Sequence, residues 1–571
     1  MSGSHVAWDE TARPHPSAQL HFFEDGENCM ENDTENESES SKVEVDNASS
    51  NMDPSKAEPS RLEKWWSKMR WRAQCLFPRW ISHPFSGDEA YLRSRDEKHN
   101  QETRVPLDQE LRSAAIWGVE IYGPDEIHDL YAGLDRLGWK GVGSAKPDNA
   151  ASIRVRQMRG AGSGGWMNIG HIHRRGEADR YSMVHNFATL PPGVDSLLVG
   201  VFNITPSTTA VLIAFRLNDN FGRRYEIELN TDRTTITRRR KGTWSMEWWE
   251  PVHQKEEAIA KARAELRSMV GTWFSRNLPG YFCAAEATRS FPTMELIVGE
   301  GMKWRDADDL SLRDWGTWRR LVAQDISHEV WDTEEYASLQ LAFERHRDDH
   351  NGLHVLVCLD PKKLPEEATR HVGGADLSAY TWLCNNVLGG TLVHSATVEY
   401  LMSQRRSLQH LRERMKRART GRRHVARTLT EIGGFFDRTL GSPAVLGELY
   451  AHSKHVGWYR HDCAKLTAPA WRDGEAPQEL AEMIRGQVRH LAKQLSVEEV
   501  ALREHIEQLA SILSVRESIR SQRWTLALTV LALVVAAASL IIAIPAESEL
   551  GKTLRALWHA TESVFHHVLP W

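Results

Sequence analysis

Four possible metal ligands lie close together in the stretch HSKHVGWYRHDC. His452 and His455 are three residues apart, and His461 and Cys463 follow within the same twelve residues. Imidazoles one helical turn apart can share a metal ion, and a thiolate can complete the tetrahedron that zinc prefers. The chain also has 26 histidines, so clusters arise by chance. A zinc site and an ordinary polar segment are both open interpretations.

A dense basic run follows residue 404 and could bind an anion. Its ten cations are Arg405, Arg406, Arg412, Arg414, Lys416, Arg417, Arg419, Arg422, Arg423 and Arg427. Glu413 is the only acidic residue among them. Such a run is typical of a solvated helix face, and it also favours an anionic partner such as lipid headgroups, a nucleotide or RNA. Both interpretations stay open.

The sequence contains no recognised catalytic motif. Gly160, Gly162 and Gly165 satisfy G-x-G-x-x-G, but the strand-like WMNIGHIH follows them, whereas a dinucleotide site needs a helix there. We therefore expect a hairpin loop at these glycines. Catalytic groups can still assemble from distant segments, so an enzyme stays an alternative. Its candidate pocket residues are His171, His173, Glu226, Glu228 and Glu300.

Residues 105–395 have the pattern of one globular unit. We expect helices at 124–139 and 251–277, where apolar residues recur every three to four positions. The expected strands are 114–123, 152–158, 166–173, 196–205, 209–218, 225–230, 293–299 and 352–360, with a further hairpin at 231–249. Strands outnumber helices and do not alternate regularly with them. This order predicts an α+β domain with a mixed or mainly antiparallel sheet.

Residues 396–522 have helical periodicity. Leu401, Leu408, Leu411 and Met415 keep an a/d spacing. The spacing returns in a second series, formed by Leu480, Met483, Ile484, Val488, Leu491, Leu495, Leu502, Ile506, Leu509 and Leu513. A single helix over 480–522 would be about 64 Å long. The pattern predicts a helical stalk that pairs with other copies as a coiled coil, or a bundle that folds on itself.

The stretch WTLALTVLALVVAAASLIIAIP, residues 524–545, carries no charge. Its 22 residues would reach about 33 Å as a helix, enough to cross the core of a bilayer. We therefore predict a transmembrane helix at 523–545. Arg516, Arg520 and Arg523 precede it, whereas Lys552 and Arg555 follow, so the positive-inside rule places the bulk of the chain in the cytoplasm. Residues 546–571 are expected to form a short amphipathic tail at the membrane surface.

Charge is unevenly distributed along the 571 residues. Residues 1–60 carry fourteen acidic and three basic side chains, or −11, so a total of −6 leaves +5 for the remainder. We expect 1–60 to be a disordered acidic tail and 61–104 to be a basic and aromatic linker. A charge of +5 gives no reason to expect specific DNA binding. Six scattered cysteines and an N-terminal stretch without an apolar leader indicate a reducing compartment.

The order of these parts over roughly 110–545, a cytosolic α+β domain followed by long helices that run into a span, resembles CorA-type metal-ion transporters. The resemblance implies an oligomeric channel whose span lines an ion path. That family has a Gly-Met-Asn motif after its first span and then a second span. This chain has IPAESELG at that position and no second apolar run.

Taken together, the sequence predicts a single-pass, membrane-anchored cytoplasmic protein. We expect its α+β domain to be a binding, signalling or scaffold module, and its helical stalk to form a homo-oligomer in the lipid bilayer. The heavy use of arginine and alanine, with 22 tryptophans, fits a GC-rich bacterial genome. The alternatives are a CorA-like channel subunit without the Gly-Met-Asn motif and a membrane-tethered enzyme with a site in 105–395.

Overall fold

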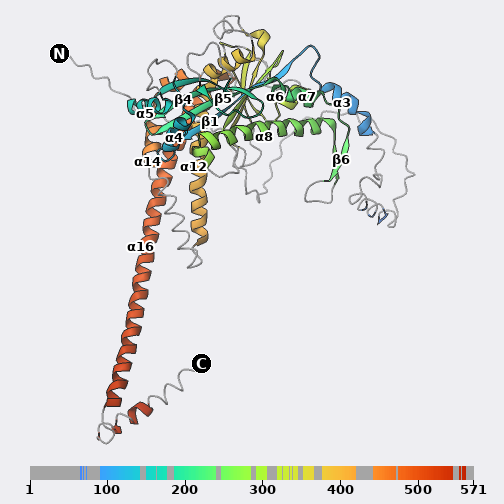
Figure 1. The fold of residues 1–571 in the computed structure, drawn as a ribbon. Helices are drawn as coiled ribbons and strands as arrows, with labels where there is room; N and C mark the ends of the chain where they lie inside the picture. The colour runs from blue at the N-terminus through green and yellow to red at the C-terminus, as the bar shows by residue number, and fades with distance from the viewer. Residues whose placement is uncertain are drawn as a thin grey trace, which may run out of the picture. The chain divides into compact units, whose positions relative to one another are not determined.

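A computed structural model of the chain is shown in Figure 1. The residues that it describes are 91–141, 150–162, 164–176, 186–239, 246–284, 291–304, 318–324, 326–333, 335–336, 338–344, 352–364, 376–418, 442–463, 465–470 and 474–543, with short helical pieces at 65–66, 69, 73, 549, 552–553 and 556–560. The predicted tail 1–60 lies outside them. The chain divides into two compact units, one up to Ser496 and one from Val497 onward. Each unit is described separately.

The first unit is built on a mixed sheet, to which the described residues contribute eleven strands. In spatial order these are β13 (Gln478–Glu479), β12 (Leu466–Ala468), β9 (Ile326–Thr333), β10 (Leu339–Glu344), β11 (His354–Leu359), β8 (Thr293–Gly299), β1 (Leu111–Tyr122), β5 (Thr208–Leu217), β4 (Val194–Thr205), β2 (Gly165–His173) and β3 (Asn186–Phe187). The pairs β8–β11 and β2–β3 are parallel, and the other pairs are antiparallel. The prediction of a mixed sheet is therefore confirmed.

The helices of this unit are α3 (Asp96–Glu102), α4 (Ile127–Leu137), α5 (Ala151–Ala161), α6 (Asp219–Gly222), α7 (Arg224–Asn230), α8 (Pro251–Asn277), α9 (Tyr281–Ala284), α10 (Trp318–Val322), α12 (Leu377–Ala418), α14 (Ser442–His452), α15 (Val456–Asp462) and the start of α16 (Leu480–Ala543). A separate hairpin, β6 (Ile236–Arg239) with β7 (Met246–Trp249), is antiparallel as predicted, and its tip lies outside the described residues.

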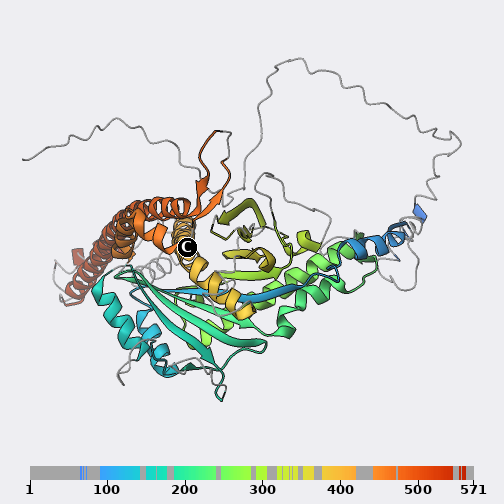
Figure 2. The ribbon, with the colours of Figure 1, turned by 90° about the horizontal axis from the view of Figure 1, so that it is seen from above.

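The central strand β1 is buried along its whole length, because helices cover both of its faces. On one face, Ile116 joins an apolar core with Val270 and Phe274 of α8. A Cβ atom at Gly118 would lie 2.4 Å from Cγ1 of Val270, so this glycine permits the close approach of α8. On the other face, Trp117 donates a hydrogen bond of 3.1 Å to Asn385 of α12. Figure 1 shows α8 beneath the sheet, and Figure 2 shows α12 crossing above it.

Local signals in the sequence place the ends of several helices correctly. The predicted helix 251–277 is confirmed as α8, which starts with Pro251 in its first turn. The predicted helix 124–139 is shorter, as α4, and ends at Gly138 with a left-handed φ of 67°. In both helices the apolar residues that recur at helical spacing face the core.

Two predicted strands are wrong, because both segments are helices. Residues 152–158 lie in α5, where Val155 is buried and Ile153 is 43% exposed. Residues 225–230 lie in α7, where Tyr225 and Leu229 are buried, one helical turn apart. Alternating apolar residues suggested strands in both cases, but only residues at helical spacing meet the core.

The stretch 396–522 is helical only in part. α12 begins at Leu377 and runs through the expected boundary at 395, and the short strands β12 and β13 extend the sheet within this stretch. Residues 480–522 lie in one helix, α16, which continues without a break to Ala543. The second unit consists of α16 from Val497 onward and the helical pieces at 549–560.

Candidate membrane helix and candidate site residues

The second half of α16 is long and apolar enough to cross a membrane. The candidate span is Ser518–Leu540, 23 residues of which none is buried in the protein. At 1.5 Å per residue, it is about 35 Å long, which matches the hydrocarbon core of a bilayer. Leu531 and Leu533 are 59% and 69% exposed, an arrangement that is unfavourable in water for so many neighbouring apolar side chains.

Three hydroxyl groups inside this stretch, those of Thr525, Thr529 and Ser539, bond to the helix itself. Thr525 donates to the carbonyl of Ser521 at 2.9 Å, and Thr529 donates to the carbonyl of Thr525 at 2.8 Å. Ser539 does the same to Val535 at 2.8 Å. Since an unsatisfied polar group is costly in hydrocarbon, these bonds lower the cost of placing the three side chains in a membrane core.

The four residues of the predicted zinc site are not brought together as ligands. The ring of the buried His452 lies 6.1 Å from that of His394 on α12 and 5.4 Å from that of Tyr459. His455 is exposed just before α15, His461 is exposed in the last turn of α15, and Cys463 is buried after it. Among the residues that the structure describes, no group of three or more His, Cys, Asp or Glu could hold a metal. The zinc hypothesis therefore has no geometric support here.

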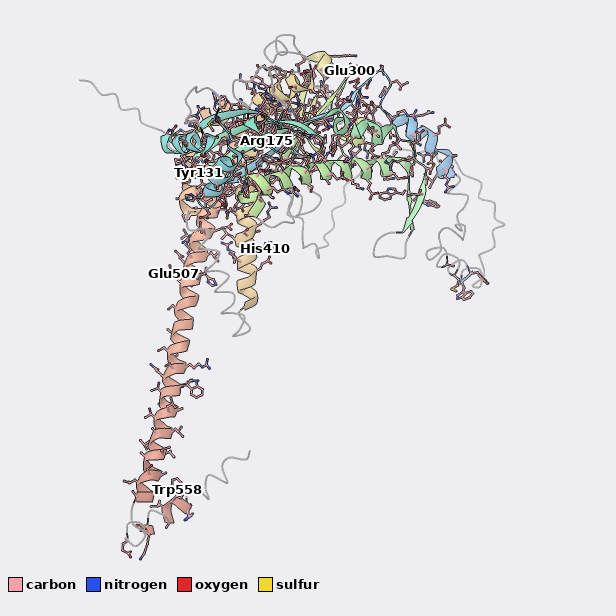
Figure 3. All side chains as sticks on the ribbon, viewed as in Figure 1. Tyr131, Arg175, Glu300, His410, Glu507 and Trp558 are labelled. Atoms are coloured by element: carbon pink, nitrogen blue, oxygen red, sulfur yellow. The ribbon has the colours of Figure 1, made fainter. Side chains whose placement is uncertain are left out.

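The basic run begins on α12, as expected for a charged helix face. Arg405 and Arg412 are partly exposed, and Arg406 pairs with Glu399, about two helical turns earlier. His410 of the same segment is exposed and is labelled in Figure 3. The side chains of Arg414, Lys416 and Arg417, and the residues Arg419, Arg422, Arg423 and Arg427, lie outside what the structure describes. An anionic partner for this run stays a prediction.

The candidate enzyme residues lie on separate elements, with the two histidines on the sheet and Glu226 and Glu228 on the helix α7. His171 and His173 stack on each other on β2, with ring centroids 6.1 Å apart. Glu300 follows β8, which is separated from β2 by β1, β5 and β4, and it pairs with Lys362 at 2.6 Å. Glu228 pairs with Arg233. In Figure 3, Glu300 also lies apart from Arg175, two residues beyond β2.

The glycine motif connects a helix to a strand. Gly160 lies at the end of α5, Gly162 follows it with a φ of 116°, and Gly165 opens β2. The expected hairpin is therefore wrong, because a helix and not a strand precedes the glycines. The order is still the reverse of the strand and helix that a dinucleotide site requires.

The sheet does contain a polar cluster that the sequence did not indicate, centred on the fully buried Glu295 of β8. Ser113 and Tyr225 donate hydrogen bonds of 2.7 and 3.0 Å to its carboxylate. Nε of Arg263 lies 3.5 Å from one carboxylate oxygen, and Nε2 of His354 lies 3.9 Å from it. Arg263 also donates to the carbonyl of Val322 at 2.6 Å. The cluster thus joins α7, α8, β1, β8 and β11.

The pKa values of Tyr225 and Arg263 in this cluster are both raised, but by different causes. Burial, followed by the charge of Glu295, raises the pKa of Tyr225 well above its ordinary value. Burial alone would lower the pKa of Arg263, but Tyr225 and Glu295 reverse this effect and raise it. The arginine stays charged and the phenol stays neutral. The cluster is enclosed in the core, so its clearest role is to hold α8 in register on the sheet.

A second buried carboxyl group, Glu120 on β1, holds the segment after α8. It accepts hydrogen bonds from the backbone N–H groups of Phe282 at 2.7 Å and Cys283 at 3.1 Å. Burial raises its pKa to about 8. The same burial, with Glu120 nearby, raises the pKa of the Cys283 thiol, which is therefore a poor nucleophile at neutral pH. A charged residue inside an apolar strand such as AAIWGVEIY is the signal that could have indicated this group.

No known protein family, no curated protein and no solved structure matches this chain. The class of protein is defined by its fold and its apolar helix. In its described part, the chain is a mixed α/β protein with an eleven-stranded sheet and one candidate membrane helix near the C-terminus.

Proposed function

We propose that this chain is a single-pass membrane protein whose sheet unit works as a cytoplasmic binding or scaffold module. The observation that carries the proposal is the exposed apolar stretch Ser518–Leu540 of α16. Transferring such a surface from water to hydrocarbon is worth about 25 cal/mol for each Å². The internally bonded hydroxyls of Thr525, Thr529 and Ser539 lower the cost of that transfer.

Membrane extraction of the full-length chain with alkaline carbonate tests the anchor. The wild-type chain is expected in the pellet. The triple variant Val530→Arg, Val534→Arg and Val535→Arg replaces exposed valines of the span, and each arginine near the helix centre costs about 2.5–3.5 kcal/mol on insertion. We therefore expect the variant in the supernatant.

The matched control changes Val497, Val500 and Val515 to arginine. These valines are also exposed on α16, but they precede the span. This control chain should stay in the pellet. Equal extraction of the two triple variants, or a soluble wild-type chain, would contradict the anchor.

We also propose that copies of the chain associate through one face of the span. Small and polar residues recur along α16 at alternating steps of four and three, at Ser518, Gln522, Thr525, Thr529, Ala532, Ala536, Ser539 and Ala543. Small residues at this spacing let two membrane helices approach closely, and all of these positions are exposed. Association through this face would account for a membrane stalk that forms homo-oligomers.

Disulfide crosslinking in native membranes tests this face. Ala532→Cys lies on it, whereas Val534→Cys lies on the opposite side of the same helix turn. Oxidation is expected to convert the first variant into a covalent dimer and to leave the second at the wild-type background. Equal yields from both positions would show that the small-residue face is not the interface.

A further inference from the structure

Three cations gather around the phenol of Tyr450, within the first unit. Tyr450 lies on α14, and Lys454 follows in the turn after that helix, with its Nζ 4.6 Å from the centre of the Tyr450 ring. Arg489 comes from α16, with its Cζ 5.9 Å from the same ring centre. Lys493, one helical turn after Arg489, adds a third positive charge that acts on the phenol.

The turn that carries Lys454 is fixed on α16. Arg485 donates a hydrogen bond of 3.1 Å to the carbonyl of the fully buried Ser453, while its other nitrogens bind Glu482 at 2.6 and 2.9 Å. The Ser453 hydroxyl donates to the carbonyl of Tyr450 at 2.7 Å. The backbone between Tyr450 and Lys454 is therefore held before any ligand arrives, which lowers the entropic cost of binding.

The charges of this group are not balanced within the described part of the chain. The neighbouring cation Arg460 lies near two carboxylates, those of Glu479 and Glu482, at 3.3 and 3.7 Å. By contrast, the described residues place no carboxylate within 4.0 Å of Lys454, Arg489 or Lys493. The cations instead act on the phenol: a hydrogen bond with Arg489, and then the charge of Lys454, lower the pKa of Tyr450.

The four side chains match the chemistry of a phosphate group. Two ammonium groups supply point charges with three donors each, and a guanidinium supplies a planar fork that suits phosphate oxygens. The tyrosine hydroxyl adds a further donor. We propose that Tyr450, Lys454, Arg489 and Lys493 form a binding site for a phosphate monoester or diphosphate group. An anion there replaces repulsion between three like charges with charge-assisted hydrogen bonds.

Isothermal titration of the full-length chain in nonionic detergent tests the site, with inorganic phosphate and pyrophosphate as soluble probes. Short-chain phosphatidic acid, below its micelle concentration, is the lipid probe, and short-chain phosphatidylcholine is its control. Saturable binding of pyrophosphate is expected, and added salt should weaken it. If only phosphatidic acid binds, the ligand is a lipid headgroup; if pyrophosphate binds equally well, it is a free phosphate compound.

Variants then connect the binding to these side chains. Lys454→Gln, Arg489→Gln and Lys493→Gln should each weaken binding at least about tenfold, because each removes a charge-assisted hydrogen bond to the anion. Tyr450→Phe keeps the ring and should weaken binding several-fold. The triple glutamine variant should abolish binding.

A charge-matched control is Lys98→Gln, Lys261→Gln and Lys465→Gln. It removes the same total charge from exposed positions elsewhere in the first unit, so it should bind like the wild-type chain. Equal binding by the two triple variants, or no saturable binding of any phosphate probe to the wild-type chain, would overturn the proposal. The test is independent of the membrane anchor, since Tyr450, Lys454, Arg489 and Lys493 all precede Val497.

Discussion

The unit up to Ser496 and the apolar part of α16, Ser518–Leu540, differ in which groups they bury and which they expose. The first unit encloses charges: Glu295 and Arg263 are both buried in its core. The apolar helix exposes hydrocarbon: Leu531 and Val534 are 59% and 49% exposed. In the first arrangement the two buried charges are partners, so neither is left uncompensated in the core. The second has no core of its own, and its exposed apolar side chains have a lower free energy in an apolar phase than in water.

The two regions also differ in how far apart in sequence their hydrogen-bonded groups lie. In the first unit, Tyr122 donates to the carbonyl of Leu278, which is 156 residues away in sequence. In the apolar helix, Thr529 donates to the carbonyl of Thr525, four residues away. The sheet unit therefore depends on long-range packing, whereas the apolar helix can form locally wherever water is absent.

Removing one partner of a buried charge should have the largest effect on stability. Arg263→Leu leaves the Glu295 carboxylate without its cation, at an expected cost of about 3–5 kcal/mol in the free energy of unfolding. Urea unfolding of the full chain in detergent, followed by tryptophan fluorescence, measures this. The control Arg523→Leu lies on the exposed part of α16 and should change the value by less than about 0.5 kcal/mol. Similar losses in the free energy of unfolding for both variants would show that the buried charge pair is no more important for stability than an exposed arginine of α16.

Glu120 should make the stability of the sheet unit depend on pH. Its pKa rises from 4.5 to about 8 on folding, so the folded state holds a proton that the unfolded state releases in this window. The contribution of Glu120 to the free energy of unfolding should therefore be complete below pH 4.5. It should fall by roughly 1.4 kcal/mol for each pH unit as pH rises toward about 8, where the loss is complete.

Glu120→Gln mimics the protonated carboxyl group and should flatten that pH profile. Unfolding of the variant and of the wild-type chain between pH 4 and 9 gives the comparison. Two profiles with the same slope would show that Glu120 is not the group that titrates.

The smallest expected effect concerns the packing of α8 on β1. Gly118→Ala places a methyl group 2.4 Å from Cγ1 of Val270, and such overpacking costs about 1–3 kcal/mol. Gly447→Ala is the matched control, because no atom lies within 4 Å of its new methyl group and α14 gains a better helix former. We expect a lower unfolding midpoint for the first variant and an unchanged or higher one for the second. A midpoint for Gly118→Ala equal to wild type would show that α8 can move away from β1.

Local patterns were sufficient for part of the fold. α8 and β8 have the predicted bounds, and the strands β4 and β5 lie within two residues of theirs. They could be predicted because their apolar residues recur at one clear period and turn residues bound them. The errors at α5 and α7 have the opposite cause, since their short apolar patterns fit either period and only packing selects the helix.

The polar groups of the sheet unit could not be predicted in this way. Ser113 and Glu295 are 182 residues apart in sequence, and Tyr450 on α14 contacts Arg489 on α16. The periodicity of apolar residues along the sequence does not indicate such pairs. The reverse case is the zinc hypothesis: His452 and Cys463 are close in sequence, but the described residues contain no group of three or more possible ligands that could hold a metal.

The sequence by itself determined the uninterrupted α16 and its uncharged stretch, because helix formation and hydropathy depend on residues a few positions apart. Only the tertiary structure decided that Arg263 and Glu295 are buried as a pair and that Lys454 and Arg489 lie together around Tyr450. Burial is a property of distant segments packed together, and the energy of a charge depends on that packing.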